Sequence, residues 1–391
     1  MYFAKHPYLC KAIIMFDFIS VMGYNMNTYL FLLFCLAVIV QLLFVLLIYG
    51  RLGFHKEKIR PGEQKGVSIL IAARNESENI FKFLPFILEQ DYPEFEVIII
   101  NHQSTDDSKF ILNAYQRQYS NLRIIEIEKS HHISFGKKLP LTLGVKGAKY
   151  DQLLLTDTDC QPTSNQWLKS MQSHFTNKHQ IVLGYGPYSP GKGWVNRLIC
   201  FDTAWIAMNY LSFAKVNMPY MGIGRNMAYT KEVFNKVDGF KSHSSISSGD
   251  DDLFIQEAAK NKNYTINIDP DSFCYSKAEE SWKDWIAQKS RHYTTVPKYK
   301  VIKKMMLGIY PLSMLIMLGT FVSLLLDSNF LLIVVALFTF NLLIKWLIIG
   351  LVFQKLKESK FIALMPLLDI GYAILTPIMY YTTDKANGKK W

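Results

Sequence analysis

Long apolar stretches lie near both ends of the chain, and a mixed pattern fills the middle. The first stretch has Gln41 as its one clearly polar side chain, and the third has Lys345 as its one charge. The first three are each long enough to cross about 30 Å of hydrocarbon as a helix, so we expect three membrane spans. A fourth contains two prolines and Asp369, and we expect either a span or an interfacial segment there. In order, the four stretches are residues 29–49, 305–326, 330–352 and 361–381.

Between residues 51 and 304, short apolar runs alternate with stretches of helical periodicity. The short runs indicate buried strands, and a helix is expected after each of the first three. This alternation is typical of βαβ units, so we predict an α/β domain with a mostly parallel sheet. The predicted strands are Val67–Ala72, Phe95–Ile100, Leu122–Ile127 and Gln152–Thr156. The chain then divides into an N-terminal segment without an assigned role (1–28), a transmembrane helix (29–50), the α/β domain (51–304) and a C-terminal transmembrane region (305–391).

Basic residues flank the apolar stretches and set the expected orientation. They follow the first span, precede the second and follow the third, and such flanks face the cytoplasm. We therefore expect a multi-pass protein of the inner (plasma) membrane, with its central domain in the cytoplasm and its N-terminus outside. The net charge of +11 then indicates contact with anionic lipid headgroups, and we expect no nucleic acid partner. The flanking residues are Arg51, His55, Lys56, Lys58 and Arg60; Lys298, Lys300, Lys303 and Lys304; and Lys355, Lys357 and Lys360.

Two carboxylates, Asp157 and Asp159, follow the fourth predicted strand. In open α/β sheets, ligands bind beyond the carboxyl ends of the strands. Residues i and i+2 of an extended segment point the same way, so both carboxylates can share one cation. Hard oxygen ligands at such an edge suit Mg²⁺ or Mn²⁺ that also holds a diphosphate. Taken alone, an Asp-x-Asp triplet would equally suit a solvated turn.

A second acidic group, formed by Asp250, Asp251 and Asp252, stands at the start of a helix predicted over residues 251–260. Like charges so close raise at least one pKa, which suits a general base near neutral pH. The alternative is a helix N-terminus whose dipole the carboxylates complement without any chemistry. Either Asp250 or Asp251 is the candidate base, and we favour Asp251.

Three other polar side chains are candidates for phosphate or acceptor contacts. Gln288 and Arg291 are three residues apart on a helix expected to begin near Ser281, so they share one face. The guanidinium of Arg291 suits bidentate contact with a phosphate. Lys137 follows Gly136 at another helix start and faces either the diphosphate or solvent. A further helix start is expected at Ser104 or Thr105, with one of these side chains as its cap.

The order of these motifs resembles the GT-A fold of family 2 glycosyltransferases, the inverting, membrane-anchored kind. The motifs are SILIAARNE at 68–76, IIINHQSTDDS at 98–108, LLLTDTDC at 153–160, SGDDDLF at 248–254 and QKSRHY at 288–293. The resemblance implies a Rossmann-like GT-A domain, with Asp159 as a metal ligand and Asp157 beside it. It also implies donor or diphosphate contacts from Arg74, Asn75, Glu76, His102, Lys137, Asp157, Gln288 and Arg291, and acceptor contacts from Gly224, Arg225 and Asn226.

Two positions depart from the family's pattern. Asn101 and His102 stand where the acidic turn usually offers an aspartate pair, so the nucleobase of the donor is left open. The last motif ends in His292 rather than tryptophan, which argues against a close likeness to processive polysaccharide synthases.

The sequence therefore predicts a membrane-anchored inverting glycosyltransferase. We expect it to use a nucleotide-diphosphate sugar and a divalent metal at the cytosolic membrane face, with a lipid-linked or cell-envelope glycan as acceptor. Two alternatives stay open. One is a processive polysaccharide synthase, and the other is a non-catalytic, degenerate transferase that acts as a binding or scaffold protein.

Overall fold

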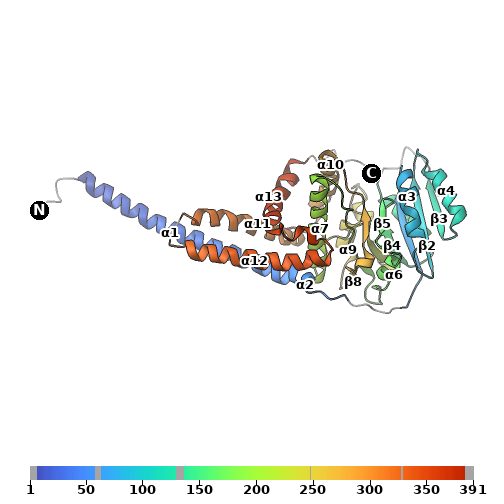
Figure 1. Cartoon of the computed structure of the whole chain (residues 1–391), viewed down its shortest axis with the longest axis horizontal. Coiled ribbons are helices and arrows are strands. Elements are labelled where there is room, and N and C mark those ends of the chain that lie inside the picture. The colour runs from blue at the N-terminus through green and yellow to red at the C-terminus, as the bar shows by residue number, and fades with distance from the viewer. Residues whose placement is uncertain (1–6, 58–62, 129–135, 247, 327–328, 384–391) are drawn as a thin grey trace.

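A computed structural model shows a bundle of long helices at one end of the molecule and an α/β domain at the other (Figure 1). The structure describes residues 7–57, 63–128, 136–246, 248–326 and 329–383. The N-terminal helix extends beyond the rest of the bundle, while the edge of the sheet that carries β3 lies at the opposite end (Figure 1).

Three long apolar helices form the bundle. The N-terminal one comprises α1 (Pro7–Phe44), a π-helical turn (Val45–Tyr49) and α2 (Gly50–Gly53), and it packs beside α11 (Val301–Leu324) and α12 (Leu331–Lys355). In the described part of the chain, Met26–Gly53, α11 and α12 are the helices long and apolar enough to cross a membrane. The prediction of one N-terminal and at least two C-terminal candidate spans is confirmed. The segment without an assigned role belongs to α1 from Pro7 onward.

Polar side chains inside the bundle are paired with one another. Gln41 donates hydrogen bonds of 2.7 Å to the carbonyl of Tyr310 and to the hydroxyl of Ser313. Lys345 forms a buried ion pair with Asp369 at 2.5 Å, and the hydroxyl of Tyr310 donates to the same carboxylate at 2.8 Å. These contacts explain how an apolar stretch carries a charge, because an ionisable group in a membrane segment is stabilised by an interior partner.

Helix α13 (Met365–Thr382) runs across the bundle next to α7 (Trp194–Lys215) (Figure 1). The hydroxyl of Tyr372 in α13 donates to Asp202 in α7 at 2.7 Å, and the Tyr372 ring packs against Trp205 with centroids 5.3 Å apart. Unlike α11 and α12, α13 is not among the candidate spans of the described residues. Whether residues 361–381 form a span or an interfacial segment stays a prediction.

A seven-stranded sheet forms the centre of the α/β domain, in the order β3-β2-β1-β4-β7-β6-β8. The four strands predicted from the sequence are parallel to one another, as expected. β7 runs antiparallel to β4 and β6, and their pairing was not predicted because β7 has four residues and β6 only three. A separate antiparallel pair, β5 and β9, follows the end of β4. The strands are β1 (Val67–Ala73), β2 (Phe95–His102), β3 (Leu122–Ile127), β4 (Gln152–Thr156), β5 (Cys160–Pro162), β6 (Ile181–Leu183), β7 (Met227–Thr230), β8 (Tyr264–Ile266) and β9 (Cys274–Ser276).

Helices cover both faces of the sheet, because successive side chains of each strand point to opposite sides. Ile69 and Ile71 of β1 pack with α3, α4 and α6, whereas Leu70 packs with α5 and α7. The helices of the domain not yet named are α3 (Ser77–Leu88), α4 (Ser108–Gln118), α5 (Lys138–Gly147), α6 (Trp167–Gln172), α8 (Lys231–Lys236), α9 (Asp252–Ala258) and α10 (Trp282–Tyr293), with 3₁₀ turns at Lys241–His243, Pro270–Ser272 and Val296–Lys298. A further 3₁₀ turn, Ser359–Phe361, lies between α12 and α13.

The α/β domain and the bundle share one hydrophobic core. Phe44 of the N-terminal helix packs against Phe213 of α7, with ring centroids 6.0 Å apart. Phe201, at the other end of α7, packs against Phe353 of α12 at 5.9 Å. The candidate membrane helices therefore fix the position of α7, and α7 in turn supports one face of the sheet.

Candidate active site

The two carboxylates after β4 lie among charged and polar partners from distant parts of the chain. Lys137, just before α5, donates a hydrogen bond to Oδ1 of Asp157. Ser276, at the end of β9, donates its hydroxyl to Oδ2 of Asp159. The pairing of β5 with β9 brings Ser276 opposite Cys160, the neighbour of Asp159. Lys137 therefore contacts the acidic pair and is not simply a solvated lysine.

The two carboxylates have opposite protonation tendencies. Burial alone would raise the pKa of Asp157, but the Lys137 ammonium and then Arg225 and Arg291 outweigh burial, so its pKa is lowered. Burial and the charge of Asp157 raise the pKa of Asp159, against the hydrogen bond from Ser276. A cation bound between them would favour the ionised form of both, because opposite charge stabilises a carboxylate.

Glu76 adds a third carboxylate near this pair. It stands between β1 and α3, and Asn79 donates a hydrogen bond to its Oε2 at 2.6 Å. Burial raises the pKa of Glu76, and the charges of Asp159 and Asp157 raise it further. Glu76 therefore lies within electrostatic reach of the acidic pair, and its donor contact stays a prediction.

Asp157 and Asp159 suit a divalent cation, although they do not form a complete cage. Among the residues that the structure describes, no group of three or more His, Cys, Asp or Glu side chains is arranged to hold a metal ion. Mg²⁺ is usually bound through one or two carboxylates, and substrate phosphates and waters complete its shell. The two carboxylates fit a site of that kind, in which the diphosphate of a substrate supplies the remaining ligands.

Asn75 fixes the turn after β1 to the turn after β2. Its backbone has a φ of 53°, a left-handed conformation that Asn tolerates better than most residues. Its N–H donates to the hydroxyl of Ser104 at 2.9 Å, and its side-chain oxygen accepts from the N–H of Thr105 at 2.8 Å. The Asn75 side chain thus braces the loop that carries Arg74 and Glu76.

The helix cap predicted at Ser104 or Thr105 is wrong. α4 begins at Ser108 with Asp107 as its N-cap residue. Ser104 and Thr105 instead bond to Asn75, as described above, and Asp106 accepts a hydrogen bond of 2.9 Å from the N–H of Ser77. A contact between two turns about 30 residues apart in the chain competes with local capping, and capping rules read from sequence do not include it.

The two residues that depart from the family's acidic turn are both buried. Asn101 donates to the carboxylate of Glu126 at 3.0 and 3.2 Å and accepts from the hydroxyl of Ser104 at 2.5 Å. His102 is 0 % exposed, and burial and then the charge of Arg74 lower its pKa, so its ring is neutral at pH 7. Direct donor contact from His102 would therefore require an opening, whereas Arg74 is partly exposed at the end of β1.

The three consecutive aspartates have three different environments. Asp252 accepts hydrogen bonds from the hydroxyls of Thr295 and Tyr299, and this fixes α9 to the segment after α10. Asp251 caps α9, and its Oδ2 accepts from the N–H of Gly224 at 3.1 Å. Asp250 lies within electrostatic reach of Lys137. Helix capping and an acidic site are thus both present at this helix start.

Asp251 has the protonation behaviour expected of a general base. Burial, and then the charges of Asp250 and Asp252, raise its pKa to about 8. A carboxylate of that basicity accepts a proton far more readily than an ordinary aspartate, and the best general bases have a pKa near the working pH. Asp252 is already occupied by Thr295 and Tyr299, which leaves Asp251 and Asp250 as the two candidates.

Arg225 and Gln288 meet at Tyr188. Arg225 donates from Nε and Nη2 to the carbonyl of Gly186 at 2.8 and 2.5 Å, and its guanidinium lies over the Tyr188 ring, 4.3 Å from the centroid. Gln288 of α10 donates to the hydroxyl of Tyr188 at 3.1 Å. The predicted acceptor-side loop and the predicted motif on α10 are therefore linked through one tyrosine.

Asn226 lies beneath this loop. It is 0 % exposed, and its amide donates to the carbonyls of Tyr185 and Ser272 at 2.7 Å each. Its side-chain oxygen accepts from the indole N–H of Trp167 at 3.0 Å. Because these contacts bury the side chain, we assign it to support of the loop, and the acceptor-side prediction is kept for Gly224 and Arg225.

Sequence reasoning missed Tyr188 and Ser276. Ser276 belongs to a three-residue strand whose pairing partner is more than a hundred residues away, and neither strand has a detectable periodicity. Tyr188 follows a Gly-Tyr-Gly-Pro stretch that resembles an ordinary turn. In both cases a long-range pairing places the residue, so no local signal was available to identify it.

Two family models match this chain. The model described as "Glycosyl transferase family 2" matches residues 68–237, from β1 to the end of α8, and includes Asp157 and Asp159. The model described as "Glycosyl transferase family group 2" matches residues 155–355, more than half of the chain, and includes α9, α10, α11 and α12. The chain also resembles a solved mannosyltransferase from Pyrobaculum calidifontis in complex with GDP-Man and Mn²⁺, with a TM-score of 0.52 and 16% identity over 88% of this chain and 99% of that one.

Curated relatives match over shorter segments. A poly-β-1,6-N-acetyl-D-glucosamine synthase from Staphylococcus epidermidis is 33% identical over 95 residues, 24% of this chain and 22% of that protein. The glycosyltransferase AglE from Haloferax volcanii is 30% identical over 175 residues, 44% of this chain and 53% of that protein. Both matches span less than two thirds of the relative's own length. From the two family models, with the GT-A arrangement and acidic site described above, the chain belongs to glycosyltransferase family 2.

Proposed function

We propose that this protein transfers a sugar, with inversion, from a nucleotide-diphosphate sugar to a lipid-linked or cell-envelope glycan. The observation that carries the proposal is the cluster at the end of β4, where Asp157 and Asp159 lie with Lys137 and two arginines. The carboxylates suit the metal of a metal–diphosphate group, and the cationic side chains suit its phosphates. The Mn²⁺ and GDP-Man complex of the P. calidifontis mannosyltransferase supports this choice of ligand class.

The donor side supplies charge for the leaving diphosphate. Lys137, Arg225 and Arg291 all lie within electrostatic reach of Asp157, so a phosphate bound there meets three positive charges. Asp157 holds the Lys137 ammonium in place through a hydrogen bond. A divalent cation bound at Asp157 and Asp159 would polarise the phosphoryl oxygens. Preorganised charge of this kind stabilises the negative charge that develops on the leaving group.

The acceptor side supplies the base. In this mechanism Asp251 removes the proton from an acceptor hydroxyl, and the hydroxyl oxygen attacks the anomeric carbon from the face opposite the diphosphate. The new glycosidic C–O bond forms as the bond to the diphosphate oxygen breaks, which inverts the anomeric centre. The pKa of about 8 on Asp251 provides the required basicity, and the N–H of Gly224 orients its carboxylate.

A processive polysaccharide synthase is the second candidate, because the S. epidermidis synthase is 33% identical over 95 residues. Product length separates the two functions. A single-transfer enzyme yields one added sugar per acceptor, whereas a processive one yields long chains while most of the acceptor is still unused. His292, in place of the tryptophan of the processive pattern, favours single transfer.

Release of nucleoside diphosphate by the purified full-length protein tests the proposal. A panel of UDP- and GDP-sugars is incubated with Mn²⁺, with and without membrane lipid extract as acceptor. We expect one donor to be consumed, faster with the extract, and Asp251→Asn to abolish the increase. If the protein binds nucleotide sugars yet consumes none of them under either condition, the non-catalytic scaffold reading replaces this one.

A further inference from the structure

A cavity lies where the N-terminal helix meets the α/β domain, and the candidate catalytic residues do not line it. Its volume is about 840 Å³, within the ~300–1,000 Å³ typical of ligand pockets. One wall comes from the last turns of the N-terminal helix and the segment that follows it. The other comes from residues before β6, from the end of α7 and from β8. None of the residues assigned above to donor, metal or acceptor contacts lines it.

The helix side of the cavity changes from apolar to basic within one turn. Leu46 and Leu47 line the cavity and are 47 % and 57 % exposed, on the part of the span nearest the domain. Arg51, four residues beyond Leu47, lies about 6 Å further along the axis of the helix. In a membrane crossed by this helix, the cavity would extend from the level of the acyl chains to the level of the lipid headgroups.

The domain side of the cavity is also basic. Lys178 and Lys262 are exposed and line this wall, opposite Arg51 and Lys56 on the helix side. Glu57 is the one carboxylate among the described lining residues. Positive charges from both walls repel one another, and an anion between them would relieve that repulsion.

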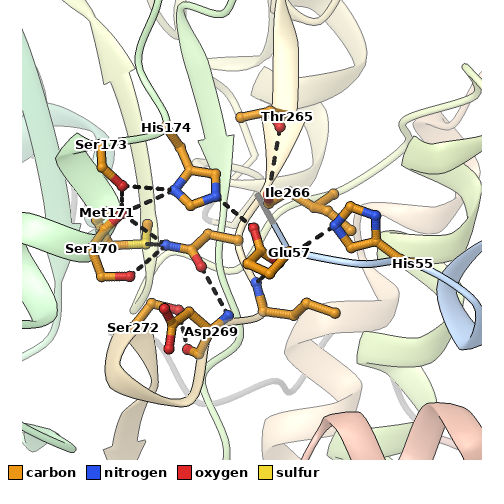
Figure 2. Close-up of polar contacts among 12 residues, drawn as sticks. His55, Glu57, Ser170, Met171, Ser173, His174, Thr265, Ile266, Asp269 and Ser272 are labelled. Atoms are coloured by element: carbon orange, nitrogen blue, oxygen red, sulfur yellow. Dashed lines mark hydrogen bonds and ion pairs between the residues drawn. The ribbon is translucent and has the colours of Figure 1, made fainter. Parts of the chain in front are cut away.

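The Glu57 carboxylate links the two walls of the cavity (Figure 2). Its carboxylate is 2.6 Å from Nε2 of His174 and 3.4 Å from Nε2 of His55. Burial alone would raise the pKa of Glu57, but these two histidines lower it to about 2. Lys355 of α12 donates to the carbonyl of His55 at 2.6 Å, which also fixes this segment. This network fixes the segment after the N-terminal helix and keeps Glu57, the one carboxylate among the described lining residues, engaged.

We propose that this cavity binds the phosphate headgroup of an anionic membrane phospholipid, with its acyl chains lying along Leu46 and Leu47. Only a ligand that is anionic at one end and apolar at the other matches both parts of the lining. Lysine and arginine side chains near a membrane attract anionic lipids in this way. The bound lipid would hold the α/β domain in one orientation on the membrane. The proposal does not depend on the chemistry of the active site.

Lipid retention by the full-length protein tests this inference. The protein is reconstituted with phosphatidylcholine containing phosphatidylglycerol, extracted in mild detergent, and its bound lipids are counted by native mass spectrometry. Lys178→Glu/Lys262→Glu should weaken retention of phosphatidylglycerol by at least about tenfold, because two attractive charges become repulsive. Lys109→Glu/Lys236→Glu reverses two exposed lysines outside the cavity and should retain the lipid normally. Lys178→Gln/Lys262→Gln serves as a milder variant if charge reversal impairs folding.

Equal retention of phosphatidylglycerol in the cavity variants and the control variant would overturn the proposal. A second arm measures thermal stabilisation of the protein by inorganic phosphate and by phosphatidylglycerol. We expect phosphatidylglycerol to stabilise the protein and phosphate at equal concentration to have little effect. If phosphate alone gives the full stabilisation, the cavity binds a free anion and the lipid assignment is wrong.

Discussion

Lys289 of α10 forms a buried ion pair with Asp202 of α7, and each side chain is only 6 % exposed. Tyr372 of α13 donates a hydrogen bond to the same carboxylate. Lys289 is the neighbour of Gln288 and lies on the same helix as Arg291, so this ion pair fixes the helix that carries two predicted substrate contacts. Helices α7 and α13 therefore position the part of the candidate active site that α10 carries.

Replacing Lys289 with Met should destabilise the protein strongly. The change leaves the Asp202 carboxylate buried with no cationic partner, and breaking a buried pair in this way costs about 3–5 kcal/mol. Asp202→Asn/Lys289→Met removes both charges and keeps an oxygen for the hydroxyl of Tyr372. We expect the double variant to unfold at a higher temperature than Lys289→Met in a detergent thermal melt. Equal melting temperatures would contradict the expected cost of leaving the Asp202 carboxylate buried without its cation.

Asp251→Asn should separate catalysis from donor binding. A positioned general base contributes about 10²–10⁴-fold in rate, so turnover should fall by that order while the donor Kd changes little. Single-turnover rates and calorimetric donor binding measure the two quantities. Asp250→Asn is the matched comparison, one residue away. If Asp250→Asn is inactive and Asp251→Asn is active, the general base is Asp250. If both variants transfer sugar at normal rates, these aspartates only cap the start of α9 and neither acts as the base.

Asp251 should also make stability depend on pH. Its pKa is about 8 in the folded protein against 3.8 in an exposed aspartate, so the folded state binds the proton more tightly. Stability from this group is complete below about pH 4 and is lost as the pH rises towards 8. The side chain of the Asp251→Asn variant stays neutral at every pH, so only the wild type loses this stability. The melting temperature of the variant minus that of the wild type should therefore increase between about pH 4 and about pH 8. A difference between the two proteins that stays constant with pH would contradict the raised pKa.

Local patterns identified the parallel half of the fold and the acidic pair. Strands β1 to β4 are apolar runs followed by polar turns, and Asp157 and Asp159 stand at a strand end, where ligands bind in open α/β sheets. The antiparallel half was missed because β6 and β7 are too short to show a period. Lys137 was ambiguous from sequence, since only the fold brings its ammonium to Asp157.

Some predicted contact residues turned out to support the loops of the site. Asn75 and Asn226 match the family's motifs, but one braces a turn and the other is buried below a loop. A motif records that a residue type is required at a position, and it does not distinguish a ligand contact from a hydrogen bond that shapes the loop. The hydrogen bond from Tyr372 of α13 to Asp202 of α7 could not be predicted either, because the two residues are 170 positions apart in the chain.

The basic flanks of the spans predict that the α/β domain faces the cytoplasm, and a single cysteine tests this. Native Cys160 is 0 % exposed and unsuitable for labelling, whereas Lys109 is exposed at the start of α4. In Lys109→Cys, a membrane-impermeant maleimide should react after cells are opened and not before. The unmodified protein provides the background. Strong labelling in intact cells would place the domain outside and contradict the orientation drawn from the lysines and arginines.

The central claim is that Asp157 and Asp159 hold a divalent metal together with the diphosphate of the donor. Nucleoside diphosphate binding to the purified protein, with and without Mn²⁺, measures this directly. We expect Mn²⁺ to tighten binding in the wild type and to have no effect in Asp159→Asn. Asp151→Asn removes an exposed carboxylate just before the same strand and should behave as the wild type. If Mn²⁺ tightens nucleotide binding equally in Asp159→Asn and in the wild type, the metal site lies elsewhere and the account is wrong.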